Sequence, residues 1–423
     1  MKPARILGLL ISMVLLLSCA KKDTIDPQIL EGYPDFIALS VSNQTDLARE
    51  EAAFVIPVLE LKKRNADFNP EAFIVLAGGV ELASQENDLN GDGQVDQIVC
   101  ISDFKPGEKR QITVRYHRFG AKQRDYPRRT QAELSHKTGG YFEKHEYIGG
   151  AFTNVRFLRV PDEHTDHSYF IRYEGPGWES DRVGYRFYLD WRNAIDIFGK
   201  KVPDMVLQNV GQDGFDSYHE MADWGMDILK VGESLGIGSV GMWIGDRVER
   251  VSQTDSITCA IIATGPVQSI IRTSYYGWQA AGGRYDLVSE LSIAAGSRLT
   301  RHEVTIVPNP DNLCTGIVKH PGAKVITEPD SGSEWTYLGT FGRQSLADDN
   351  LGMAIIFRRQ DLLELTEDEH NLVVVLRPAA GKLTYYFLAT WEQEPDGIRA
   401  EGEFIEYLDR LKREKSGPLE VVL

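Results

Sequence analysis

The stretch Ser269-Ile270-Ile271-Arg272-Thr273-Ser274-Tyr275-Tyr276 consists largely of β-branched and aromatic residues, the types that favour β-strands. Similar short runs recur along the chain, for example at 185–191 and 383–389, and Gly, Pro, Asn and Asp separate them. No repeat of about 20 to 50 residues connects these runs, which argues against a propeller or a solenoid. The sequence therefore predicts an all-β protein with few helices.

These runs divide the chain into blocks. Residues 33–120 contain several of them and predict a small N-terminal β-sandwich. Residues 121–150 are polar and basic, and we expect a linker there. Residues 151–423 predict a second, much larger sandwich. Only two segments, 216–229 and 404–415, indicate helices of any length.

The first residues match a bacterial lipoprotein signal. Two basic residues precede an apolar run over 6–17, which is too short to span a bilayer as a helix. The run leads into Ser18-Cys19-Ala20, the kind of site that a lipoprotein signal peptidase cleaves. We therefore expect a signal peptide over 1–18, a lipid on Cys19 and a polar tether over 19–32. The lipid would anchor the protein in the cell envelope, at the periplasmic or surface side of the outer membrane. An ordinary secretory peptide is the alternative.

Charge and cysteine content narrow the classes of protein. The formal net charge of -16 leaves no basic field for phosphates, so nucleic acid is excluded as a partner. Three cysteines remain once Cys19 is acylated, and an odd number excludes a full disulfide framework. Cys100 and Cys259 lie in apolar runs, which indicates buried thiols; a bridge between Cys259 and Cys314 is the alternative. The common hydrolase, nucleotide and redox motifs do not occur.

The run Asp88-Leu89-Asn90-Gly91-Asp92-Gly93-Gln94-Val95-Asp96 resembles the start of a calcium-binding loop. Oxygen-bearing side chains occupy its positions 1, 3, 5 and 9, which are Asp88, Asn90, Asp92 and Asp96. Position 12 is Val99, so the usual bidentate glutamate is missing. The pattern predicts either a structural Ca²⁺ site or an Asx-rich turn that binds its own backbone.

The densest polar and aromatic stretch runs from 172 to 201. It holds six basic and five acidic residues, a positive balance in an acidic chain, and therefore indicates an anion site. A strand over 185–193 would place Arg186, Tyr188, Asp190 and Arg192 on one face. Such a face beside Trp178 and Trp191 suits a sugar, because rings stack on aromatic side chains and arginines bind a carboxylate. The alternative is a solvated outer face with salt bridges.

A second polar stretch, 213–238, contains Tyr218 and His219 next to a glycine-bearing turn. Its polarity favours a functional role for His219 over plain packing. The other histidines are weaker candidates: His145, His164, His167, His302 and His320. The run 163–167 has metal-ligand residue types, but its spacing fits no known template.

The runs 174–200, 217–219 and 224–232 resemble an uncharacterised family of exported proteins from polysaccharide-degrading Bacteroidetes-type bacteria. The small domain with its Asp88–Asp96 turn fits this family too, and the similarity covers nearly all of the mature chain. The resemblance implies a galactose-mutarotase-like supersandwich over 151–423. It also implies similarity to the oligosaccharide dehydratases that act on ulvan, a sulfated polymer of rhamnose and uronic acid.

The resemblance implies a lyase that eliminates water, or an alkoxide, across C4–C5 of a terminal uronic acid in an acidic oligosaccharide. Arg186, Arg192 or a metal ion would neutralise the sugar carboxylate, and the proton-transfer groups would come from the set His219, Tyr218 and Tyr188. The remaining substrate contacts implied are Asn193, Trp178 and Lys230. No cofactor is expected apart from the candidate structural Ca²⁺.

Three other functions stay open on the sequence. A sugar mutarotase or epimerase could use the same fold. A non-catalytic glycan-binding lipoprotein would bind the oligosaccharide without turnover. A glycoside hydrolase could use the carboxylates of Glu174 and Asp181, and the distance between them would decide that question.

Overall fold

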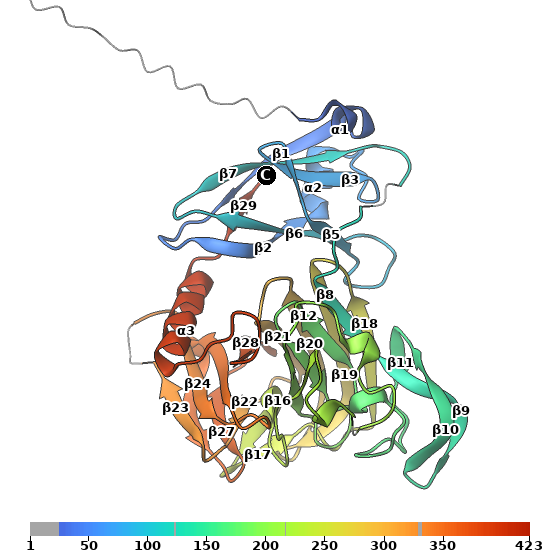
Figure 1. The fold of residues 1–423 in the computed structure, drawn as a ribbon, viewed down its shortest axis with the longest axis vertical. Helices are drawn as coiled ribbons and strands as arrows, with labels where there is room; N and C mark the ends of the chain where they lie inside the picture. The colour runs from blue at the N-terminus through green and yellow to red at the C-terminus, as the bar shows by residue number, and fades with distance from the viewer. Residues whose placement is uncertain (1–24, 122–123, 216, 329–331) are drawn as a thin grey trace, which may run out of the picture.

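The computed structural model describes residues 25–121, 124–215, 217–328 and 332–423 (Figure 1). Within these ranges the chain forms 29 β-strands, three α-helices and four short 3-10 helices, and every strand pairing is antiparallel apart from one isolated bridge, so the all-β prediction is confirmed. The expected signal peptide over 1–18, the lipid on Cys19 and the first part of the tether lie outside the described residues. No helix in the described ranges has the length and apolar character needed to cross a membrane.

Two sheets form a small N-terminal sandwich, drawn in blue and cyan in Figure 1 apart from the red C-terminal strand β29. One sheet has the strand order β29-β1-β7-β3-β4, and the other has the order β2-β6-β5. Apolar side chains of both sheets fill the space between them, among them Val41, Ile56, Ile98 and Val114. The strands are β1 (Asp35–Ser42), β2 (Arg49–Pro57), β3 (Phe73–Ala77), β4 (Val80–Leu82), β5 (Ser84–Asn87), β6 (Gln97–Phe104), β7 (Lys109–Tyr116) and β29 (Glu420–Val422). Two short helices, α1 (Pro27–Gly32) and α2 (Val58–Arg64), accompany them.

The expected linker over 121–150 is wrong. Strand β8 (Thr130–Glu133) joins a sheet of the large block, and β9 (Ser135–Glu143) pairs with β10 (Glu146–Asn154) in a two-stranded hairpin. This hairpin projects from the side of the block (Figure 1). Most of its residues are exposed or half-buried, so its strands carry no alternating apolar pattern that would distinguish them from a loop.

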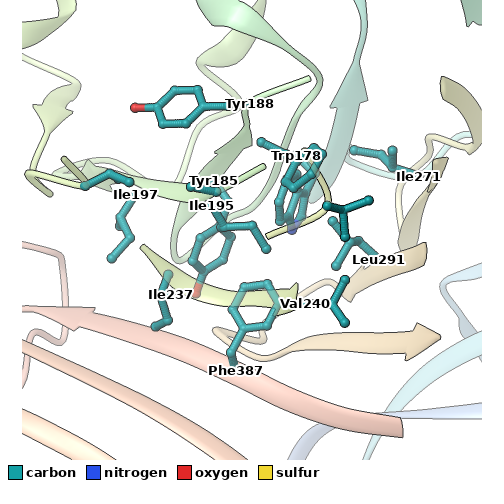
Figure 2. Close-up of a cluster of buried hydrophobic side chains, with 14 of the residues drawn as sticks. Trp178, Tyr185, Tyr188, Ile195, Ile197, Ile237, Val240, Ile271, Leu291 and Phe387 are labelled. Carbon is teal, nitrogen blue, oxygen red and sulfur yellow. The ribbon is translucent and has the colours of Figure 1, made fainter. Parts of the chain in front are cut away.

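Three sheets make up the large block. A nine-stranded sheet has the order β11-β18-β19-β20-β21-β28-β25-β24-β23, and two five-stranded sheets have the orders β15-β14-β13-β12-β8 and β17-β16-β22-β27-β26. One large buried cluster joins all three sheets; it includes Tyr185 and Ile195 of the first five-stranded sheet, Val240 of the second, and Leu291 and Phe387 of the nine-stranded sheet (Figure 2).

The candidate functional site lies around the first five-stranded sheet. Its elements are η1 (Arg172–Glu174), β12 (Gly177–Ser180), β13 (Gly184–Phe187), β14 (Ile195–Lys200), η2 (Leu207–Asn209), η3 (Ser217–His219) and β15 (Gly225–Asp227). The other strands of the block are β11 (Phe157–Arg159), β16 (Ile237–Ile244), β17 (Arg247–Arg250), β18 (Ser256–Ala263), β19 (Gln268–Ala280), β20 (Gly283–Ala294), β21 (Thr300–Val307), β22 (Leu313–Val318), β23 (Ala323–Thr327), β24 (Trp335–Arg343), β25 (Asn350–Arg358), β26 (Leu362–Glu367), β27 (Asn371–Leu376) and β28 (Lys382–Trp391).

Of the two expected helices, one is correct. Helix α3 (Glu401–Ser416) contains the predicted 404–415 segment and buries Phe404, Leu408 and Leu411 in a cluster with β24. The helix expected over 216–229 is wrong, because only η3 forms there before β15. Gly225 explains the difference: it has φ 134°, and a Cβ atom at this position would lie 1.8 Å from the carbonyl oxygen of Gly199. This close approach to β14 requires glycine.

Gln85 of β5 links the small sandwich to the large block. Its side-chain carbonyl accepts hydrogen bonds from the backbone N–H groups of Val267 and Gln268, both at 3.0 Å, and its amide donates to the backbone carbonyl of Gln268 at 2.8 Å. A small apolar cluster that includes Val99, Ile101 and Val267 lies beside this junction.

The described cysteines Cys100, Cys259 and Cys314 are all free and buried. The alternative of a Cys259–Cys314 bridge is therefore wrong, and the prediction of buried thiols is confirmed.

Candidate functional site

Strand β13 ends at Phe187, so the strand expected over 185–193 is less than half as long as predicted. The chain turns after it: the backbone carbonyl of Asp190 accepts from the N–H of Asn193 at 3.1 Å, and the Asp190 side chain accepts from the N–H of Arg192 at 2.9 Å. Polar side chains that bind the next backbone amides favour turns over strands. The turn nevertheless brings Arg192 back to the same side as Arg186.

Arg186 is the centre of a buried ion-pair network. Its guanidinium donates to Asp196 at 2.7 and 3.1 Å and to Asp227 at 2.5 Å. Its remaining nitrogen donates to the hydroxyl of Tyr218 at 2.9 Å, and the hydroxyl of Tyr188 donates to Asp196 at 2.5 Å. We call these five residues, together with Arg192 and His219, which contact them, the network. Strand pairing builds it, because Arg186 lies directly opposite Asp196 in the β13–β14 ladder and β15 pairs with β14 on its other side.

Arg192 extends the network toward the surface. It binds Asp190 at 2.5 Å, Glu174 at 2.8 Å and Asp166 at 2.9 Å. Its guanidinium lies 4.0 Å from the centre of the Tyr188 ring, and that of Arg186 lies 4.9 Å from the same ring. The two arginines thus meet at Tyr188, and each is already paired with protein carboxylates.

His219 is the part of the network that reaches solvent. Its side chain is 45% exposed, its Nε2 lies 3.3 Å from an Asp227 carboxylate oxygen, and its Nδ1 lies 2.7 Å from the backbone carbonyl of Phe215. Both ring nitrogens therefore face acceptors, which favours the doubly protonated imidazolium. The hydrogen bond to Asp227 raises the pKa of His219 above its ordinary value of 6.5. The ring of Tyr218 lies 4.6 Å away, centre to centre.

Carboxylates outnumber cations in this region. The two guanidiniums are paired with five carboxylates: Asp166, Glu174, Asp190, Asp196 and Asp227. Burial, reinforced by the charge of Asp227, raises the pKa of Asp196 to about 7. Burial also raises the pKa of both phenols, Tyr188 and Tyr218. A pKa of about 7 places the protonation change of Asp196 close to neutral pH, whereas both phenols stay protonated there.

Backbone strain gathers around the same residues. Ten non-glycine residues of the described chain have positive φ, and half of them lie at or next to this network. They are His167 (57°), Tyr169 (56°), Tyr173 (39°), Glu174 (72°) and Asn193 (44°). Such conformations are costly, and in proteins they cluster at functional sites. The backbone strain is independent of the charges, and it lies around the same residues as the ion-pair network.

A cavity of about 400 Å³ adjoins the network. It lies between the β9–β10 hairpin and the loop 211–215, and four aromatic residues line it: Phe152, Tyr169, Tyr173 and Phe215. Its charged lining residues are Lys137 and Asp213. Phe215 connects the cavity to the network, because its backbone carbonyl accepts the hydrogen bond from His219. Lys137 gives no signal of a site in the sequence, because the polar hairpin that carries it resembles a linker.

Several predicted substrate contacts lie elsewhere. Trp178 is buried in the core beside Tyr185, and its indole N–H donates to Thr300 at 2.9 Å, so it presents no face to a sugar; Figure 2 shows Tyr188 apart from this pair. Asn193 is also buried and donates to the hydroxyl of Tyr275 at 2.9 Å. Lys230 is exposed, and within the described residues no hydrogen bond or ion pair links it to the network.

The histidines named as weaker candidates fall into separate environments. His302 is buried between Ser289 and the carbonyl of Gly238, and burial lowers its pKa to about 4. His164 is buried too and bonds to Ser168 at 2.7 Å. His145 and His320 are exposed. His167 pairs with Asp166 at 2.7 Å, next to Arg192.

Asp166, His167 and Glu174 are the one group in the described chain whose His, Cys, Asp or Glu ligand atoms all lie within 4.8 Å of one another. Arg192 binds both carboxylates of the group, so a guanidinium already supplies the positive charge that a metal ion would bring. The arrangement therefore favours ion pairing over metal binding.

The loop Asp88–Asp96 connects β5 to β6 and bonds to its own backbone. Asp88 accepts from the N–H groups of Gly91 at 2.7 Å and Gly93 at 2.8 Å, and Asp96 accepts from that of Leu89 at 2.6 Å. Asn90 and Asp92 accept from amides two residues further along. These are the contacts that the Asx-turn alternative requires, and calcium binding at this loop stays a prediction.

The family described as "Domain of unknown function (DUF4861)" matches residues 41–421, which span both sandwiches. A search of curated proteins gave no match.

Proposed function

Because the chain belongs to the DUF4861 family, whose description names no activity, we propose a function from its site: a carbohydrate-active lyase of the cell envelope that removes water from the terminal uronic acid of an acidic oligosaccharide during polysaccharide degradation. One observation carries the proposal. An imidazole, two phenols and two guanidiniums form a single bonded network beside a cavity with aromatic walls.

The elimination needs a base and an acid. The base removes the proton from C5 of the uronic acid, and the electrons of that C–H bond form the C4=C5 double bond. The C4–O bond breaks at the same time, and the departing hydroxyl takes a proton from the acid and leaves as water. No oxidant and no further reactant is consumed.

His219 is suited to be the acid. It is exposed, it lies beside the cavity wall, and its hydrogen bonds to Asp227 and Phe215 favour the protonated ring. The raised pKa values of Tyr188 and Tyr218 keep both phenols protonated near neutral pH, which argues against either as the resting base. Asp213 is the sole carboxylate among the residues that line the cavity, and we assign the base to it.

Arg186 has a positioning role in this proposal. It is 3% exposed and binds the two residues that adjoin His219, namely Tyr218 and Asp227. It therefore holds the acid in place and does not contact the sugar. This differs from the sequence-based expectation that Arg186 and Arg192 bind the substrate carboxylate.

Glycoside hydrolysis and non-catalytic binding receive less support than elimination. Glycoside hydrolysis would require Glu174 and Asp181 to face one sugar, whereas Glu174 binds Arg192 and Asp181 binds Arg129 and the N–H of Gly296. A mutarotase or epimerase would use the same acid and base without loss of water. A non-catalytic binding protein would not require the imidazole of His219 and the carboxylate of Asp213 beside its cavity.

Incubation with oligosaccharides that end in a uronic acid tests the proposal, because elimination creates a conjugated double bond that absorbs ultraviolet light. His219→Gln should slow the reaction by about 10² to 10⁴-fold, the usual contribution of one acid–base group. His145→Gln is the matched control, since His145 is exposed at the β9–β10 turn, and it should keep the wild-type rate. The absence of product from every uronate tested, or an unchanged rate in His219→Gln, would overturn the proposal.

A further inference from the structure

The arginines of the network are not available to a substrate carboxylate. The Arg186 side chain is 3% exposed and that of Arg192 is 11% exposed. Their N–H groups point at Asp196, Asp227, Asp190, Glu174 and Asp166 and at the hydroxyl of Tyr218. A uronic acid bound at this site needs a different cation, because the C5 proton is only weakly acidic beside an unneutralised carboxylate.

Lys137 is a cation of the kind required. It extends from β9 into the cavity wall, and its ammonium lies 5.4 Å from the centre of the Phe152 ring and 6.0 Å from that of Tyr169. Within the described residues no carboxylate pairs with it, whereas both arginines of the network are paired. Contact with two ring faces holds the ammonium in position without neutralising its charge.

The cavity around Lys137 has the shape and chemistry of a sugar site. Its volume of about 400 Å³ falls in the range of small-ligand pockets, which starts at about 300 Å³. Aromatic rings from the hairpin (Phe152), from the 169–173 segment (Tyr169, Tyr173) and from the 211–215 loop (Phe215) line it. Tyr173 is 3% exposed, so the rings left to stack on a pyranose are those of Phe152, Tyr169 and Phe215. The side-chain NH2 of Gln212 donates to the carbonyl of Gln208 at 2.9 Å, and its side-chain oxygen can accept from a sugar hydroxyl.

We propose that this cavity binds the anionic sugar ring, with the ammonium of Lys137 as the partner of its carboxylate. The inference rests on the proposed function for the identity of the anion as a uronate. Lys137 is then the residue that makes the site specific for charged over neutral sugars. It also assists the elimination, because neutralising the carboxylate makes the C5 proton easier to remove.

The test compares binding of two ligands, a uronate oligosaccharide and its matched neutral counterpart with a hydroxymethyl group in place of the carboxylate. Lys137→Met keeps the length of the side chain and removes the charge. It should weaken binding of the uronate by about 10- to 100-fold, as expected for the loss of one hydrogen bond to a charged group, and leave the neutral sugar unaffected. Lys137→Arg should recover most of the affinity, and Lys144→Met, at the exposed tip of the same hairpin, is the control and should match wild type.

The outcomes separate this inference from the proposed function. Binding that depends on Lys137 without any turnover would overturn the lyase and support the anion site. Turnover with the same KM in Lys137→Met as in wild type would support the lyase and overturn the anion site. Equal weakening of both ligands in Lys137→Met would also overturn the inference, because the lysine would then only shape the cavity.

Discussion

His219 and Asp227 form the contact on which the proposed acid depends. The carboxylate of Asp227 is shared, since it binds both Arg186 at 2.5 Å and the imidazole at 3.3 Å. A shared carboxylate fixes the orientation of the ring and favours its charged form. The proton that His219 would give to the leaving hydroxyl is therefore stabilised by a residue that is itself 1% exposed.

Substitution of Asp227 should lower the pKa of His219. In the wild type this pKa is raised above 6.5, mainly by the hydrogen bond to Asp227, and Asp227→Asn removes the negative charge. An acid must be protonated to act, so activity should fall as pH rises through the His219 pKa, and this limb should move to lower pH in Asp227→Asn. Titration of the His219 ring by NMR measures the shift directly. An identical titration curve in both proteins would contradict the assignment.

Some of these residues could be found from the sequence and some could not. Arg186, Tyr188, Tyr218 and His219 stand in polar, aromatic stretches of an acidic chain, which is an unusual local composition. Their partners are a matter of strand register: Asp196 faces Arg186 only because β13 and β14 pair with that alignment. No local pattern encodes such a contact.

Strands β12 to β15 carry the network, and a second buried ion pair supports them. Lys200 of β14 binds Glu179 of β12 at 2.6 Å and the carbonyl of Ser180 at 2.7 Å, with both charged side chains fully buried. The other oxygen of Glu179 accepts from the N–H groups of Val206 and Leu207. This pair therefore ties the sheet to the loop that follows β14.

Removal of Lys200 should be strongly destabilising. Lys200→Met leaves Glu179 buried without its cation, and breaking a buried ion pair in this way costs about 3–5 kcal/mol. Denaturant unfolding at pH 8 measures the loss in the free energy of unfolding. The double variant Lys200→Met/Glu179→Gln removes the orphaned charge and should recover part of that loss. A loss below about 1 kcal/mol in Lys200→Met would show that the pair is not the support described here.

Apolar patterning separates the helices and strands that the sequence predicts from those that it does not. Helix α3 was predictable because Phe404, Leu408 and Leu411 share one buried face. The β9–β10 hairpin was not, because it buries little and its sequence is polar. The cavity lies against this hairpin, so the least predictable element also supplies Lys137 to the site.

The C-terminal strand β29 belongs to the small sandwich, although the large block precedes it in the sequence. After the large block, α3 leads the chain back to the small sandwich, where β29 pairs with β1 (Figure 1). Val421 packs against the core of the sandwich, whereas Val422, the next residue along the strand, is 45% exposed. A three-residue strand gives no signal in the sequence, so the pairing of β29 with β1 could not be predicted.

Val421 and Val422 allow a matched test of how β29 packs against the small sandwich. Val421→Asp places a charge against the apolar core of the small sandwich and should lower its free energy of unfolding by about 1–3 kcal/mol. Val422→Asp carries the same substitution on the exposed face and should change it by less than about 0.5 kcal/mol. Thermal unfolding of the full chain measures the change in stability of each variant. Limited proteolysis shows whether cleavage within residues 33–120 becomes faster. Equal stability of the two variants would contradict the packing of β29.

We propose that the network and its cavity remove the C5 proton and the C4 hydroxyl group of a terminal uronic acid, which together leave as one molecule of water. Mass spectrometry of an oligosaccharide ending in a uronic acid, after incubation with the protein in D₂O, tests it most directly. We expect a product lighter than the substrate by one water, formed by wild type and only slowly by His219→Gln. An oligosaccharide of unchanged mass, or one that gains a single deuterium at C5 and keeps its water as an epimerase would leave it, would contradict the claim.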